Sequence, residues 1–234
     1  MTLKSSSPLL LPASCAALTL ALLYAFPLRR WFAHWGTTPG ERTRVMAGDA
    51  VIAHPTHSST LAVTVDSPPQ DIWPWLAQMG YGRGGLYSYD WLDRLAGILN
   101  HPSSNRILPQ FQQLAVGDRI LLGPARRGEA LTVAALDPPR TLVFSYKEHG
   151  IEWVWQFGLY PLGHNRTRLV TRGAERIPHT LNGWLFMRAL EPAAFIMTRR
   201  MLLVLKQRAE SLRPPGVNSK TERPWANRPR LGEL

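Results

Sequence analysis

The stretch IWPWLAQMGYGRGGLYSYDWLD, residues 72–93, is the most informative part of this 234-residue sequence. It holds three tryptophans, three tyrosines and four glycines. Trp and Tyr combine a large apolar surface with one polar group each. An aromatic run that is broken by glycines favours a surface that closes over a hydrophobic cavity. The glycines follow a predicted helix and lack the GK[ST] pattern of a phosphate-binding loop, so the stretch does not predict a nucleotide site.

The composition is that of a globular protein, with 45% hydrophobic and 18% charged residues. The net charge is +11, but most of the positive residues are arginines scattered along the chain. Such a charge suits a protein beside an anionic membrane as well as a nucleic-acid-binding protein. We therefore predict no nucleic-acid partner. The one cysteine, Cys15, lies in an apolar run, so neither an intramolecular disulfide nor a cysteine-based metal site is predicted.

Residues 8–28 contain no charged side chain and have about the length that crosses a bilayer core, roughly 20 residues. Lys4 precedes this segment, and the residues that follow it are charged or aromatic: Arg29, Arg30, Trp31, Phe32 and Trp35. This arrangement is typical of a membrane boundary. A cleaved signal peptide and a buried helix are the alternatives. We predict an uncleaved transmembrane helix in a single-pass membrane protein, with the C-terminal domain in the cytoplasm because more positive charges follow the segment than precede it.

The chain divides into four predicted parts: an anchor with its flank at residues 1–35, a linker at 36–59, one domain at 60–213 and a disordered tail at 214–234. Within the domain, helical spacing predicts helices at residues 70–79, 86–99 and 192–212. Alternating apolar and β-branched residues, with turn residues between the segments, predict strands at residues 60–65, 119–122, 131–136, 141–146, 151–160 and 167–176. Short links between successive strands imply antiparallel pairing.

This order predicts an α+β fold in which a curved antiparallel sheet wraps around a long C-terminal helix. The last helix has an apolar stripe made of Phe195, Thr198, Leu202, Leu205 and Ala209. The strand at residues 151–160 has five large apolar residues on one face: Ile151, Trp153, Trp155, Phe157 and Leu159. One helix needs less aromatic surface than this, so the sequence predicts an internal cavity.

The order of elements resembles the START-like helix-grip superfamily, also called SRPBCC, which includes polyketide cyclases, plant pathogenesis-related proteins and lipid-transfer domains. Five sequence blocks resemble an uncharacterised bacterial branch of it, in the same order: IWPWLAQMGYGRGGLYSYDWLD, RILPQFQQLAVGDRI, LDPPRTLVFSY, TRLVTR and MTRRMLLVLKQRAE. The resemblance covers about residues 60–211 and departs from the branch at Leu86, where a tryptophan is expected. It implies a helix-grip fold with a hydrophobic cavity and no particular reaction.

We predict that ten residues line this cavity: Trp75, Tyr87, Tyr89, Trp91, Arg119, Phe144, Tyr146, Trp153, Trp155 and Phe157. No catalytic residue is nominated, because the chain lacks the G-x-S-x-G and H-E-x-x-H motifs. Glu152 is the most interesting acid, but alternation points it away from the aromatic face of its strand. The seven histidines show no metal-ligand spacing, and no metal or other cofactor is predicted.

The first functional hypothesis is a membrane-tethered domain that binds a small hydrophobic or lipid-like ligand in an internal cavity. One alternative is an enzyme of the same superfamily, of the cyclase, aromatase or hydrolase type. The other is an interaction module with a filled core and no ligand. A buried histidine, or a buried glutamate–tyrosine pair, would favour the enzyme, whereas a solid core would favour the interaction module.

Overall fold

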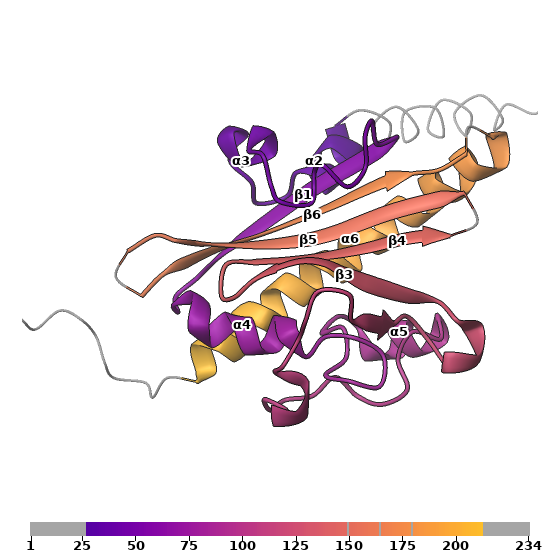
Figure 1. Ribbon diagram of the computed structural model, residues 1–234. Coiled ribbons are helices and arrows are strands. Elements are labelled where there is room, and N and C mark those ends of the chain that lie inside the picture. Colours follow the sequence, from indigo (N-terminus) through magenta and orange to yellow (C-terminus); the bar gives the residue numbers. More distant parts are fainter. Residues whose placement is uncertain (1–26, 149, 164, 179, 213–234) are drawn as a thin grey trace, which may run out of the picture.

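The computed structural model describes residues 27–148, 150–163, 165–178 and 180–212 (Figure 1). Six strands form one antiparallel sheet in the order β1-β6-β5-β4-β3-β2. The strands are β1 (His57–Val65), β2 (Arg119–Leu121), β3 (Ala130–Asp137), β4 (Thr141–Glu148), β5 (Ile151–Pro161) and β6 (Thr167–Arg176). The helices are α2 (Arg29–Ala33), α3 (Pro39–Thr43), α4 (Pro69–Ala77), α5 (Asp90–Leu95) and α6 (Leu181–Ser211), with two short 3₁₀ turns, η2 (Pro109–Phe111) and η3 (Ala125–Arg127).

The predicted α+β class and all six predicted strands are confirmed, each strand with bounds close to those expected. α6 runs diagonally across one face of the sheet, which we call the inner face (Figure 1). The stripe predicted on the last helix is buried there, because Leu202, Leu205 and Ala209 have no exposed surface. They belong to one core cluster with sheet residues such as Phe157 and Leu169.

Two helices differ from their predicted bounds. α6 begins at Leu181, well before residue 192, because the Thr180 side chain caps it by accepting a hydrogen bond from the backbone N–H of Gly183 at 3.1 Å. Pro192 lies inside the helix, where it removes one backbone hydrogen bond, and not at its start. α5 is shorter than residues 86–99, since Tyr87 has a positive φ of 59° that no α-helix contains.

Residues 36–56, which form most of the linker predicted at 36–59, lie against the opposite face of the sheet, which we call the outer face, and we refer to them as the strap. Met46 packs with Ala62 and Val170, while Ile52 packs with another outer-face pair, Val143 and Val154. Gly48 lies so close to the sheet that a Cβ atom there would be 2.8 Å from Val143 Cγ1. The outer face is therefore covered by the chain itself, although the predicted domain boundary at residue 60 stays a prediction.

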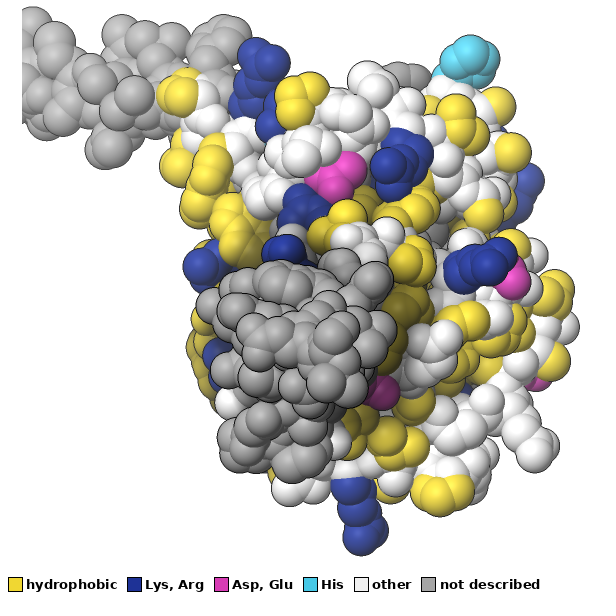
Figure 2. Space-filling model, turned by 90° about the vertical axis from the view of Figure 1, so that its left-hand side faces the viewer, with side chains coloured by type: hydrophobic (Ala, Val, Ile, Leu, Met, Phe, Trp, Pro, Cys, Tyr) yellow, Lys and Arg dark blue, Asp and Glu magenta, His cyan; other side chains and the backbone are white. Residues whose placement is uncertain are grey.

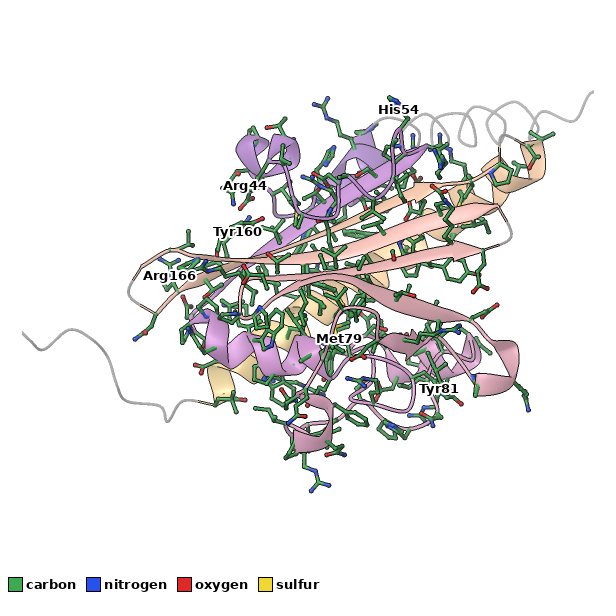
Figure 3. The ribbon with its side chains drawn as sticks, viewed as in Figure 1. Arg44, His54, Met79, Tyr81, Tyr160 and Arg166 are labelled. Carbon is green, nitrogen blue, oxygen red and sulfur yellow. The ribbon has the colours of Figure 1, made fainter. Side chains whose placement is uncertain are left out.

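The side-chain view shows the two faces of the sheet. Arg44 from the strap lies beside Tyr160 on the outer face, with the guanidinium carbon 4.3 Å from the ring centroid (Figure 3). Met79 and Tyr81 lie on the other side of the sheet, in the layer that contains α4 (Figure 3). Every outer-face contact of the strap is thus separated by the sheet from the α4 layer.

Arg172 of β6 is the polar centre of the outer face. It is buried, and all five of its N–H groups donate hydrogen bonds. The acceptors are Thr60 Oγ1, Asp49 Oδ2 at 2.6 Å, and the carbonyl oxygens of Arg44, Glu41 and Arg42. Arg168, four residues earlier in β6 and on the same face, adds an ion pair with Glu41 at 2.6 Å. The strap is held to β6 by these two arginines.

The strap also covers the free edge of the sheet. β1 is the first strand in the sheet order, and its Ala62 donates its backbone N–H to the Trp35 carbonyl oxygen at 3.1 Å. Gly36 fits tightly against the same place, since a Cβ atom there would overlap the Ala62 carbonyl oxygen. The chain therefore crosses the β1 edge as it passes from α2 to the strap.

The structure corrects the prediction of a single-pass membrane protein. In the ranges that the structure describes, no helix is both long and apolar enough to cross a bilayer. The predicted span, residues 8–28, falls outside those ranges apart from residues 27 and 28, and so does the predicted tail at 214–234.

The flank that indicated a membrane boundary packs on the domain. Arg29 forms an ion pair with Glu191 of α6 at 2.8 Å, and Phe32 stacks on Phe195 with ring centroids 4.6 Å apart. Arg199 lies over the ring of Trp35 at 4.9 Å. Arginines and aromatic residues at the end of an apolar segment suit packing on a folded domain as well as they suit a bilayer surface, which is why the sequence pattern was misleading.

The positive charge is dispersed on the face that Figure 2 shows, the end of the molecule where β5 turns into β6. Lys and Arg side chains there are separated by hydrophobic and uncharged ones. The Lys and Arg side chains of the described residues that are visible in this view do not join into a continuous basic surface of the kind that follows a nucleic-acid backbone.

Replacing Arg172 by alanine should lower the free energy of unfolding by about 3 kcal/mol or more, because Asp49 and the strap carbonyls lose a buried charged partner. Arg166→Ala is the control: Arg166 pairs with Asp66 in an exposed ion pair, so its loss should cost less than about 1 kcal/mol. Urea unfolding of both variants measures the difference. Equal stability losses would show that the Arg172 network does not hold the strap.

Candidate functional site

The sheet register arranges the inner-face side chains in rows across four strands. The row nearest the start of β1 contains His57, Glu175, Trp153 and Tyr146, and the next contains Ser59, Gly173, Trp155 and Phe144. The third row, Leu61, Thr171, Phe157 and Leu142, is buried in the core. Polar and aromatic groups therefore meet in the first two rows, at one end of the inner face.

Aromatic rings form a continuous surface in these rows. Trp153 and Trp155 are stacked, with ring centroids 5.9 Å apart and planes 16° from parallel. Trp155 also contacts Phe157 at 5.0 Å and Phe144 at 6.2 Å. The two tryptophans are only partly buried, whereas both phenylalanines are buried. The stacked indoles are thus where the aromatic surface reaches the outside of the core.

Glu175 supplies a buried carboxyl group in the first row. Its Oε2 atom is shielded from solvent, and no group in the described part of the chain forms a hydrogen bond with it. Burial, together with the nearby charge of Glu191, raises the pKa of Glu175 to about 7. A carboxyl group that titrates near neutral pH can hold, give or take a proton under ordinary conditions.

Charged groups from α2, β1 and α6 surround this carboxyl group. Glu191 lies in α6 and contacts Arg29 Nε at 2.8 Å, His57 Nδ1 at 3.5 Å and Arg188 Nη1 at 3.5 Å. Burial lowers the pKa of His57, although the charge of Glu191 opposes this shift. His57 therefore favours its neutral imidazole form, and the cluster has two carboxyl groups beside two guanidinium groups.

The structure brings together five of the ten predicted cavity residues: Phe144, Tyr146, Trp153, Trp155 and Phe157 are neighbours on the inner face. Tyr89 and Trp91 have exposed fractions of 36% and 66%, and Arg119 is exposed, with Nη2 donating to the Gly128 carbonyl oxygen. These three lie apart from the rows described above. The assignment of all ten residues to a cavity stays a prediction.

Trp75 and Tyr87, the remaining two, are packed in the core in an edge-to-face pair with ring centroids 6.1 Å apart. Gln78 donates a hydrogen bond to the Tyr87 hydroxyl oxygen at 2.9 Å, and the Arg208 guanidinium lies 4.7 Å from the Tyr87 ring centroid. Burial raises the pKa of Tyr87 to about 12. The Tyr87 hydroxyl group is therefore a polar group within the core that is bound by Gln78, while its ring contacts Trp75 and Arg208.

Sequence reasoning missed His57, Ser59, Glu175 and Glu191. A signal for Glu175 was present in the strand at residues 167–176. Arg168, Arg172 and Arg176 occupy even positions and so share one face of the strand, whereas Glu175 occupies an odd position and lies on the other face. Glu191 offered no such signal, since its place depends on where a long helix crosses the sheet. Glu152 lies on the outer side as expected and is paired with Lys147 at 3.0 Å and Arg176 at 2.5 Å.

Among the described residues, no group of three or more His, Cys, Asp or Glu side chains is arranged so that it could hold a metal ion. The described side chains supply a carboxyl group, an imidazole, a hydroxyl and indole N–H groups next to an aromatic surface.

Neither a family model nor a curated protein matches the sequence. Among solved structures, the chain is similar to protein MLL2253 from Mesorhizobium loti, with 18% identity over 68% of this chain and 100% of that one, and a TM-score of 0.39. It is similar to the Zhui aromatase/cyclase from Streptomyces sp. R1128, with 19% identity, coverage of 68% and 98%, and a TM-score of 0.39. It is also similar to PFC0360w, an HSP90 activator from Plasmodium falciparum, with 13% identity, coverage of 63% and 95%, and a TM-score of 0.40.

The fold itself is defined by the arrangement of its elements. A strand, short helices, a run of antiparallel strands and one long C-terminal helix across the inner face form a helix-grip domain. The predicted helix-grip fold is therefore confirmed, and what the domain does has to be inferred from its site.

Glu175→Gln should change how stability depends on pH. The folded protein keeps the Glu175 proton up to about pH 7, while the unfolded chain loses it near the ordinary value of 4.5, so the free energy of unfolding falls as pH rises through this window. The variant lacks this loss, and its stability relative to the wild type should rise by roughly 3 kcal/mol between about pH 4 and about pH 8. Urea unfolding at both pH values measures it.

Glu152→Gln is the matched control. The hydrogen bonds from Arg176 and Lys147 lower the pKa of Glu152, so its charged form stabilises the fold. This variant should become less stable relative to the wild type as pH rises through the titration of Glu152. Glu175→Gln behaving in the same way would contradict a raised pKa at Glu175.

Proposed function

We propose that the protein binds a small hydrophobic or lipid-like ligand on the inner face of the sheet, at the Trp153 and Trp155 rows. The observation that carries the proposal is a partly buried indole stack next to the Glu175 carboxyl group, whose Oε2 atom is buried and has no hydrogen-bond partner in the described chain. A buried polar group without a hydrogen bond costs free energy, of the order of 1–3 kcal/mol. Such groups persist where a ligand or a reaction uses them.

The composition of the site fits an apolar ligand that is oriented by few polar groups. Ligand sites are mostly lined by hydrophobic and aromatic side chains, with a small number of polar groups that fix the orientation. Here the aromatic part is the surface from Trp153 to Phe157, and the polar part is Glu175 with Ser59 beside it. The ligand body would lie on the indoles, and its polar end would face β6.

A second candidate function is acid–base catalysis on the same ligand. Its support is the buried carboxyl group of Glu175, whose pKa of about 7 is near the value that suits a general acid or base. A partly buried histidine, His57, lies in the same row. An interaction module with a filled core receives less support, because the indole stack is only partly covered.

Binding of N-phenyl-1-naphthylamine, a neutral apolar fluorescent probe, tests the proposal. Trp153→Ala should weaken binding about tenfold, since it removes half of the stacked surface, which corresponds to about 1.4 kcal/mol. Trp91→Ala is the control, because Trp91 is 66% exposed and lies outside these rows. Equal affinities of the two variants, or no saturable binding by the wild type, would contradict ligand binding at this site.

A further inference from the structure

A small gap lies over Gly173, in the second row of the inner face. A Cβ atom built on this glycine would have three nearest neighbours, which are Glu175 Oε1 at 3.6 Å, Ser59 Oγ at 3.7 Å and Trp153 Nε1 at 3.9 Å. All three are polar side-chain atoms, and they come from three different strands. The gap is thus the space that a side chain at residue 173 would fill, and it is bordered by hydrogen-bonding groups next to the indole stack.

The three groups differ in what they can bond. When Glu175 is ionised, its carboxylate oxygen only accepts hydrogen bonds, whereas an indole N–H donates and a serine hydroxyl does both. A group that enters the gap can serve Glu175 and Trp153 together only if it donates and accepts. A hydroxyl group does this, whereas an ammonium group only donates, an ether only accepts and a methyl group does neither.

We propose that the gap over Gly173 is a subsite for a ligand hydroxyl group, and that the protein therefore selects hydroxylated aromatic compounds over unsubstituted ones. The ring system lies on the stacked indoles, and its hydroxyl group donates to Glu175 and accepts from Trp153 or Ser59. The unpartnered Oε2 atom of the same carboxyl group shows that the described chain leaves Glu175 capacity for a further hydrogen bond. This inference rests on the proposed ligand binding and adds the chemical class of the ligand.

Gly173→Ala fills this gap and leaves the aromatic surface in place. The contacts of the new methyl group, 3.6–3.9 Å, are ordinary van der Waals distances. The backbone of Gly173 does not have a positive φ, so it suits an alanine. The variant should therefore fold, because alanine in a strand is no less stable than glycine. Gly40→Ala is the matched control, since a Cβ atom at Gly40 meets nothing within 4 Å and the residue lies in α3, away from the site.

The experiment compares 2-naphthol with naphthalene by competition against N-phenyl-1-naphthylamine. Wild type and Gly40→Ala should bind 2-naphthol about tenfold more tightly than naphthalene, the size expected for hydrogen bonds of ordinary strength. Gly173→Ala should lose this preference while its affinity for naphthalene changes less than about twofold. Glu175→Leu, which removes the acceptor, should lose the preference as well.

The outcomes separate this inference from the function on which it rests. Equal affinity of the wild type for both probes, which would mean that the gap holds only water, overturns the hydroxyl subsite and leaves ligand binding standing. A Gly173→Ala protein that keeps the preference for 2-naphthol also overturns it. Failure of the wild type to bind either probe overturns the proposed function and the subsite together.

Discussion

The rest of the structure depends on the hydrogen bonds and the ion pair that the buried guanidinium group of Arg172 forms. It lies in the interior of a sheet face and is neutralised by Asp49, while its other N–H groups are taken up by Thr60 and by strap carbonyls. A buried charge without such partners would be strongly destabilising, so the strap has to adopt one path over the outer face. Successive side chains of β6 point to opposite faces of the sheet, so the strand that carries Arg172 on the outer face carries Gly173 and Glu175 on the inner face.

Local patterns predicted the fold well because the strands obey simple alternation and the last helix has a continuous apolar stripe. The candidate site was predicted only in part, for a physical reason. Trp153 and Trp155 were visible as a period-two pattern, whereas the meeting of His57, Glu175 and Glu191 depends on cross-strand register and on the crossing point of α6. Register and crossing point depend on residues far apart in the chain, and the periodic spacing of apolar residues within one segment does not reveal them.

The strap escaped prediction in part because three of the five hydrogen bonds from Arg172 go to its backbone carbonyl groups, which are the same in every sequence. Its glycine, proline and threonine content resembles that of a linker, yet Gly48 is required by the close approach of the backbone to the sheet. The glycines of residues 80–85 show the same effect. A Cβ atom on Gly84 would lie 2.6 Å from the Tyr87 hydroxyl oxygen, so this glycine serves tight packing.

The passage of the chain over the β1 edge has a consequence for self-association. An exposed edge strand offers unpaired N–H and C=O groups to any other extended chain, and proteins commonly cover such edges. In this domain the Trp35 carbonyl oxygen already occupies the Ala62 N–H, and the backbone at Gly36 lies directly on the strand. The opposite edge is β2, which has only three residues. The β1 edge is therefore blocked at Ala62 and the β2 edge is short, so another extended chain would find little continuous backbone to pair with at either side of the sheet.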